Sequence, residues 1–213
     1  PTATLVSGGD VTTRDMAIIQ AANLNITAQR FGTSITPLNL DAANIHIKRL
    51  NGDIDIRQSI GIGTSVMITG PPEDGFGRIL YNRSTNLTLE AGGGGVFVSG
   101  DSIVTGSSLS LIAYQDIGSS DKHLLFDASY LSNIISYTGS VYLDSNGTNI
   151  LASGNITAYG DINIYSQAGD IDLRGEDAVI SSVTGSINLE STSGEIAHYG
   201  VTSAPEGVVR LWT

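Results

Sequence analysis

Short runs of alternating apolar and polar residues follow turn glycines in the C-terminal third of the chain. These runs cover residues 160–164, 169–173, 185–189 and 194–197. Each has a glycine, a small polar residue, and then apolar and polar residues in turn, which predicts a short strand with one buried face. The glycines recur with steps of 9, 16 and 9 residues, so the pattern returns after 25. Such a strand cannot bury its apolar face alone, so the repeat predicts a solenoid.

The predicted fold is an all-β, right-handed parallel β-helix. Residues 1–213 are expected to form a single solenoid domain of about ten coils, with the most regular repeats over 153–199. With roughly twenty residues per coil and ~4.8 Å between stacked strands, the rod would be on the order of 50 Å long. The segment around Ile18 to Ala22 fits a helix in isolation, but the alternation from Leu24 onward favours a strand.

Two long segments, approximately 9–65 and 94–151, have matching patterns. The same spacing separates three pairs of equivalent positions: Gly32 and Gly118 (86 residues), Asp41 and Asp127 (86), and Ile54 and Val141 (87). A unit of several coils is therefore predicted to be duplicated with a slip of one residue, which a loop between coils can absorb.

The alternating strand pattern is interrupted between Gly70 and Arg83. Two adjacent prolines in this region cannot donate hydrogen bonds to a strand ladder, so a protruding loop is predicted near 70–78. Loops on a rigid scaffold often carry binding residues, and an exposed phenylalanine would serve as an anchor. The candidate contact residues are Pro71, Pro72, Phe76 and Arg78. The alternative is a loop that folds back over the side of the solenoid.

Composition excludes several classes of partner. The net charge is −11 and only two residues are lysine, so neither nucleic acid nor an anionic membrane is an expected partner. The chain has no cysteine, which excludes disulfides and thiolate metal sites and fits a secreted bacterial protein. The sequence contains no long uncharged apolar run of the kind that would predict a membrane-spanning segment.

Two segments carry a resemblance to a known family. The first contains Phe31-Gly32-Thr33-Ser34, then Pro37-Leu38 and Asp41-Ala42; the second, over 116–128, keeps Leu124 but has His123 in place of the proline. Together with the Gly-Asp-Ile-Asn-Ile strands, these segments resemble the repeats of filamentous-haemagglutinin-like exoproteins. The resemblance covers most of the chain and concerns the β-helical shaft of that family.

The resemblance implies a secreted protein of the bacterial cell surface. Members of this family are exported by a two-partner system through an outer-membrane transporter, and their shafts display adhesive or toxic tips. The secretion domain of the family and its Asn-Pro-Asn motif are absent here, so the transporter is expected to act on a longer parent chain. Residues 208–213 contain few polar residues that could cap the end of a solenoid. Together with the N-terminal sequence, this leads us to expect that the chain is an internal segment of the longer parent chain.

Paired aspartates raise the question of catalysis. Asp53 and Asp55, like Asp170 and Asp172, are two residues apart on predicted strands, so each pair is expected on one outer face. On a β-helix, clustered carboxylates can bind calcium or serve as acid and base for a polysaccharide lyase or glycosidase. The competing interpretation is a solvated face, which equivalent Asn, Ser and Thr residues in other coils favour.

Other motifs predict neither a cofactor nor a metal site. His46, His123 and His198 are isolated, without a second ligand at metal-binding spacing. The glycine run over 92–95 lacks the Lys-Ser/Thr of a phosphate loop and is expected to be a turn. Five asparagines stand in Asn-x-Ser/Thr sequons and are candidate glycosylation sites: Asn25, Asn82, Asn86, Asn146 and Asn155.

The predicted function is that of a non-catalytic shaft that extends from a bacterial surface and presents binding sites. Its partners would be a glycan or protein on a host or neighbouring cell. Two alternatives from other classes stay open: a carbohydrate-active β-helix enzyme, and a solenoid subunit that associates end to end into filaments.

Overall fold

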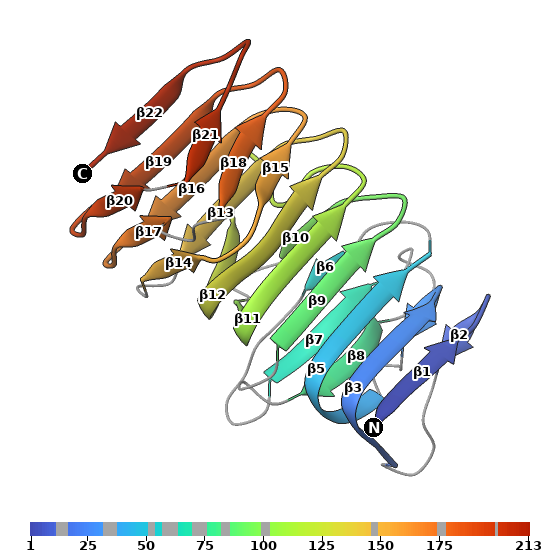
Figure 1. Cartoon of the computed structure of the whole chain (residues 1–213). Helices are drawn as coiled ribbons and strands as arrows, with labels where there is room; N and C mark the ends of the chain where they lie inside the picture. Colours follow the sequence, from blue (N-terminus) through green and yellow to red (C-terminus); the bar gives the residue numbers. More distant parts are fainter. Residues whose placement is uncertain are drawn as a thin grey trace.

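The protein is an all-β, right-handed parallel β-solenoid of about seven turns, without a helix in the described residues (Figure 1). The computed structural model describes residues 1–11, 17–31, 38–50, 54–56, 64–69, 76–81, 86–98, 103–145, 149–173, 178–198 and 200–213. Successive coils stack along one axis, with the N-terminus and the C-terminus at opposite ends of the rod. The predicted fold class is therefore confirmed.

The strands are short, and most contain between two and six residues. In the N-terminal half they are β1 (Thr2–Val6), β2 (Asp10–Val11), β3 (Ile18–Ala28), β4 (Arg30–Phe31), β5 (Leu38–Arg49), β6 (Ile54–Ile56), β7 (Thr64–Thr69), β8 (Phe76–Tyr81), β9 (Asn86–Ala91) and β10 (Val96–Val98). In the C-terminal half they are β11 (Val104–Ala113), β12 (Leu124–Ser136), β13 (Val141–Ser145), β14 (Ile150–Ala152), β15 (Ile156–Ala158), β16 (Ile162–Ser166), β17 (Ile171–Leu173), β18 (Val179–Ser182), β19 (Ile187–Ser191), β20 (Ile196–His198), β21 (Val201–Ser203) and β22 (Val209–Trp212).

Nearly all pairing between coils is parallel. Strand β3 pairs with both β1 and β5, and β16 pairs with both β13 and β19. Strand β3 includes the segment whose sequence also fits a helix, so the strand prediction for it is confirmed. In the C-terminal half each turn contains three strands, as in β16, β17 and β18, and each pairs with its counterpart one coil later.

The long strands give way to pairs of short ones after β12. Strand β12 pairs with both β14 and β15, and a turn at Gly154 separates these two. A Cβ atom at Gly154 would lie 1.5 Å from the carbonyl oxygen of Ser132, so only glycine fits this close approach between coils. The turn makes a corner of the solenoid.

The core is a set of aliphatic columns inside the coils. One column contains Leu24, Ile45, Leu87, Leu109 and Leu131, which occupy equivalent positions in successive coils and are at most 1% exposed. Each of these side chains packs on a similar side chain above and below it. This regular stacking explains why β-branched and leucine side chains dominate the inward positions.

One excursion interrupts the regular coil length. Equivalent asparagines in β3 and β5 are 21 residues apart, whereas those in β5 and β9 are 42 apart. The extra residues include β7 and β8, which pair antiparallel to each other, while β8 also pairs with β5. Because this excursion consumes a coil's length of sequence and other coils reach 25 residues, about seven turns form rather than ten.

The predicted contact loop lies in this excursion. Phe76 and Arg78 belong to strand β8, where they are in register with Thr69 and Met67 of β7, and not to a loop. Their neighbours Pro71 and Pro72 lie outside the described residues, as do several positions on which the predicted duplication of 9–65 and 94–151 depends. The duplication stays a prediction.

Buried serines hold the turns in place. The Ser182 hydroxyl accepts a hydrogen bond from the N–H of Gly185 (2.9 Å) and donates one to the carbonyl oxygen of Gly160 in the preceding coil (2.7 Å). The same Ser-x-x-Gly arrangement, in which the hydroxyl accepts the N–H of the glycine, recurs at Ser136, Ser166 and Ser191. Each such serine is at most 3% exposed. Its hydroxyl gives the backbone N–H of the turn glycine a hydrogen-bond partner that this N–H would otherwise lack.

The small polar residue after each turn glycine also links the coils. The carboxylate of Asp161 accepts the backbone N–H of Ser186 at 2.7 Å, and the hydroxyl of Ser186 accepts the N–H of Val208 at 3.1 Å. Below them, the N–H of Asp161 donates to the hydroxyl of Ser140 at 3.0 Å. This chain of bonds explains why a residue with a short acceptor side chain follows Gly139, Gly160 and Gly185.

One aspartate expected on the solvated face is buried. Asp172 of β17 is only 7% exposed, because Leu151 and Ala197 flank it in the neighbouring coils. Its partner in the predicted pair, Asp170, accepts the N–H of Glu195 at 2.8 Å and so belongs to a turn. These two residues therefore do not form an exposed carboxylate pair.

Candidate functional site

A ladder of amide side chains runs along the outer face of β1, β3, β5 and β9. The amide of Asn86 donates to the carbonyl of Asn44 at 2.8 Å, and Asn44 donates to Asn23 at 2.7 Å. Asn23 in turn donates to the hydroxyl of Thr2 at 3.3 Å. We call Thr2, Asn23, Asn44 and Asn86 the amide ladder. Its members are exposed, so their remaining donors and acceptors can reach a ligand.

A shallow hollow lies beside the amide ladder. It has a volume of about 410 Å³ and is also lined by Asn25, His46 and Thr88, which form the next outward column on β3, β5 and β9. The alternation of each strand places these side chains outward while Leu24, Ile45 and Leu87 turn inward. The hollow therefore presents amide, hydroxyl and imidazole groups.

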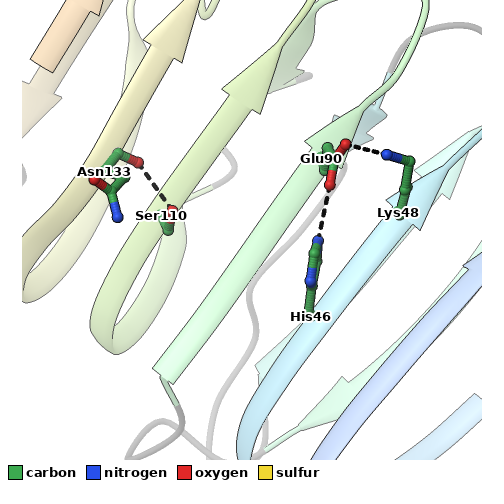
Figure 2. Close-up of polar contacts among 5 residues, drawn as sticks. All are labelled: His46, Lys48, Glu90, Ser110 and Asn133. Atoms are coloured by element: carbon green, nitrogen blue, oxygen red, sulfur yellow. Dashed lines mark hydrogen bonds and ion pairs between the residues drawn. The ribbon is translucent and has the colours of Figure 1, made fainter. Parts of the chain in front are cut away.

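A charged cluster borders the hollow. Figure 2 shows His46 and Lys48 of β5 pointing toward Glu90 of β9. The Nε2 atom of His46 lies 3.0 Å from Oε2 of Glu90, and Lys48 forms an ion pair with the other carboxylate oxygen. We call these three residues the Glu90 cluster. The Glu90 side chain is 19% exposed, while His46 and Lys48 are each about twice as exposed.

The electrostatics of Glu90 keep it ionised. Partial burial raises the pKa of the Glu90 carboxyl, but the hydrogen bonds and positive charges of Lys48 and His46 outweigh this effect and hold the pKa below its usual value of 4.5. Glu90 is therefore a carboxylate at neutral pH and a poor general acid. Both basic side chains, Lys48 and His46, contact this carboxylate.

The arrangement suits binding better than catalysis. Hydrolysis of a glycosidic bond commonly needs two carboxyl groups, one of which has a raised pKa. The hollow's lining contains no carboxylate, and in the described part of the chain no three His, Cys, Asp or Glu residues gather closely enough to hold a metal ion. A row of amides and hydroxyls instead matches the donors and acceptors of a neutral polar ligand.

Sequence reasoning singled out three members of this site, Asn25, His46 and Asn86, and missed the others. Among the sequons, Asn25 lines the hollow and Asn86 ends the amide ladder. Asn155 is exposed elsewhere, and Asn82 and Asn146 lie outside the described residues. Glu90, Lys48 and Asn44 were missed. Their signal is the matching pattern of polar residues at alternate positions in 44–48 and 86–90, which marks two outward faces of one sheet.

The other histidines lie apart from this site. The ring of His123 packs on that of Tyr142 with 5.7 Å between centroids, and Nε2 of His198 is 2.6 Å from the hydroxyl of Thr202. Figure 2 also shows the next link along the rod, where Ser110 of β11 donates to the carbonyl of Asn133 on β12 at 3.0 Å. That bond joins coils and contains no ionisable group.

The fold and this surface define a class: a parallel β-solenoid repeat protein with a polar outer face. No family model matches the chain, and neither a curated protein nor a solved structure is similar to it. No described segment forms a helix that is long and apolar enough to cross a bilayer.

Proposed function

We propose that this chain is a non-catalytic shaft segment of a secreted bacterial surface adhesin, and that it extends and presents binding sites. The observation that carries the proposal is the continuous ladder of parallel strands over one aliphatic core, from β1 to β22. Each coil contacts mainly its neighbours, so coils add length rather than a closed catalytic pocket. The net charge of −11 helps to keep such an extended surface soluble.

The finer parts of the proposal rest on the sequence resemblance. We propose that the parent chain is exported through an outer-membrane transporter of a two-partner system and that the shaft is displayed at the cell surface. A glycan or protein of a host or neighbouring cell would then contact the outer face. The amide ladder and the hollow beside it are a suitable contact surface, since their polar groups are exposed.

Two measurements test this proposal. Antibodies against the chain should label intact bacteria that carry the parent gene, and beads coated with the purified chain should bind target cells. Beads coated with the same amount of heat-denatured chain are the control for nonspecific adsorption. Labelling that requires permeabilised bacteria would contradict the surface location, and equal binding by native and denatured chain would contradict adhesion.

A carbohydrate-active enzyme is the second candidate, and one observation favours it. The Glu90 cluster places a carboxylate and two basic groups at the rim of a hollow, and such groups are part of the site of a polysaccharide lyase or glycosidase. The lowered pKa of Glu90 argues against a role as general acid, and the contacts of Lys48 and His46 with Glu90 occupy the two basic groups. Release of reducing or unsaturated sugar ends by the purified chain, lost in Glu90→Gln, would favour the enzyme over the shaft.

End-to-end association is the third candidate. Val209 and Leu211 of β22 are 42% and 53% exposed, although they are in register with the buried Ile187 and Leu189 of β19. A strand with this face can add a further coil from a second copy of the chain. Electron microscopy at rising concentration should then show rods of increasing length, whereas rods of constant length would contradict it.

A further inference from the structure

Three exposed tyrosines form a column along one corner of the solenoid. Tyr114, Tyr137 and Tyr159 directly follow β11, β12 and β15 and are 50%, 60% and 49% exposed. The backbone N–H of Tyr137 bonds to the carbonyl of Ala113, and that of Tyr159 bonds to the carbonyl of Ser136, so the three residues occupy consecutive coils. Their backbones are thus separated by one strand spacing, ~4.8 Å.

About half of the surface of each of these tyrosines is open to solvent. Among the described residues, none of these three tyrosines has a ring contact or a side-chain hydrogen bond. Large aromatic side chains usually bury their faces, and a contiguous exposed set marks an interaction surface. The carboxyl ends of β11, β12 and β15 lie along one edge of the rod in Figure 1, so the column runs parallel to the rod's axis.

Apolar and uncharged residues flank the column, and the carboxylates near it already have partners. Ile112 and Ile135, two residues before Tyr114 and Tyr137, are partly exposed and widen the column into a strip. On its other side, Thr138 donates to the carbonyl of Tyr114 and remains able to accept a hydrogen bond. Asp116 and Asp161, two residues after Tyr114 and Tyr159, already accept backbone N–H groups of the next coil. Glu90, which is in register with Ile112, is paired with Lys48 and His46.

We propose that the tyrosine column binds an extended chain of neutral pyranose sugars, with one sugar ring on each tyrosine. The C–H face of a pyranose packs on an aromatic ring, and a sugar ring in an extended chain spans about one strand spacing of ~4.8 Å. The phenol hydroxyls and Thr138 supply polar partners for sugar hydroxyls. This inference deepens the proposed adhesin function. It rests on that function only for the location of the glycan, which would be the surface of a host or neighbouring cell.

Affinity electrophoresis of the full chain tests the proposal. Native gels containing hydroxyethyl cellulose, a neutral extended polymer, should retard the wild-type chain relative to gels without polymer. The triple variant Tyr114→Ala, Tyr137→Ala, Tyr159→Ala should lose this retardation, with an apparent affinity weaker by roughly tenfold or more. A wild-type chain that is not retarded by hydroxyethyl cellulose would overturn the proposal.

Tyr130 provides the matched control. It is 46% exposed on β12 but lies outside the column, so Tyr130→Ala should retain wild-type retardation. An equal loss in Tyr130→Ala would show that the column is not the site. The circular dichroism spectrum and melting temperature of each variant establish that folding is unchanged, and single replacements with phenylalanine, which keep the ring, should retain binding if the triple variant misfolds.

A second polymer separates stacking from charge. Polygalacturonate is extended but anionic, and the acidic chain should be retarded less by it than by hydroxyethyl cellulose. Stronger retardation by polygalacturonate would overturn recognition by neutral stacking. If coated beads bind target cells but hydroxyethyl cellulose does not retard the chain, only the inference about the tyrosine column is refuted. If the polymer retards the chain but the beads do not bind cells, only the adhesin proposal is refuted.

Discussion

The carboxylate of Asp161 accepts a hydrogen bond of 2.7 Å from the backbone N–H of Ser186, which lies 25 residues later in the sequence. The bond joins the same corner of two successive coils, next to the turn glycines. Because Ser186 repeats the arrangement toward Val208, the corner is held by a chain of short side chains as well as by the strand ladders.

Replacing Asp161 with alanine should destabilise the solenoid by about 1–2 kcal/mol, since a partly buried backbone N–H loses its acceptor. Asp161→Asn keeps an acceptor oxygen and is the control, with an expected loss below about half of that. Urea denaturation followed by circular dichroism measures both. Equal losses in the two variants would show that charge, rather than the acceptor, matters at this position.

Ser182→Ala should cost about 1–3 kcal/mol because it leaves the N–H of Gly185 without a partner inside the structure. The neighbouring Ser181, which faces outward on the same strand β18, is the matched control, and Ser181→Ala should change stability by less than about 0.5 kcal/mol. Thermal melting of the two variants side by side gives the comparison. A silent Ser182→Ala would contradict the role of the buried hydroxyl.

Ile171→Asp should destabilise the protein by about 3–5 kcal/mol, because an uncompensated charge would enter the column of Ile150, Ile171 and Ile196. Thr157→Asp, on the outer face of β15, introduces the same charge in contact with solvent and should be nearly neutral. Differential scanning calorimetry distinguishes them. If both variants melt like the wild type, the inward assignment of Ile171 is wrong.

Glu90→Gln should lower stability at neutral pH by about 1 kcal/mol through loss of its ion pair with Lys48 and a weaker contact with His46. The folded-state pKa of Glu90 is lowered, so its contribution is full above the pKa of the unfolded chain and disappears as the pH falls through the folded-state pKa. Wild type and variant should therefore converge in unfolding free energy in acid, once the pH is below the folded-state pKa of Glu90. Their difference should also shrink in high salt.

Asp144→Asn should have the opposite effect. Burial raises the pKa of Asp144, even though its hydrogen bond with Gln167 and the charge of His123 act to lower it. The ionised form is thus disfavoured in the folded state, and the penalty is present above the folded-state pKa. The variant should melt higher than the wild type at pH 7, and the gain should vanish in acid, below about pH 4. A lower melting temperature at pH 7 would contradict this.

Much of the fold follows from local pattern. The alternation around Ile162 and Ile164 decides which side chains turn inward, and a repeat that cannot bury its own face has to stack. The coil number does not follow in the same way. It depends on the length of each turn and on the excursion between β5 and β9, and the prolines and glycines there indicate a break without indicating an antiparallel pair.

The candidate site was less accessible to sequence reasoning. Lys48 and Glu90 are 42 residues apart, so their contact depends on how many residues the excursion contains. Asp172 was expected to face solvent because its strand alternates, but residues of the two neighbouring coils cover it. The aligned tyrosines likewise become visible only when the coil length, which varies from 21 to 25 residues, is known at each step.

Strand β9 pairs in parallel with β5, as β3 does, although β7 and β8 are inserted between β5 and β9 in the sequence. The inserted strands are themselves bonded to the stack, because β7 pairs with β6 and β8 pairs with β5. The solenoid therefore takes up additional sequence within one coil and still brings the next coil back into register, so one flank can differ from the rest without a change in the stacking of later coils.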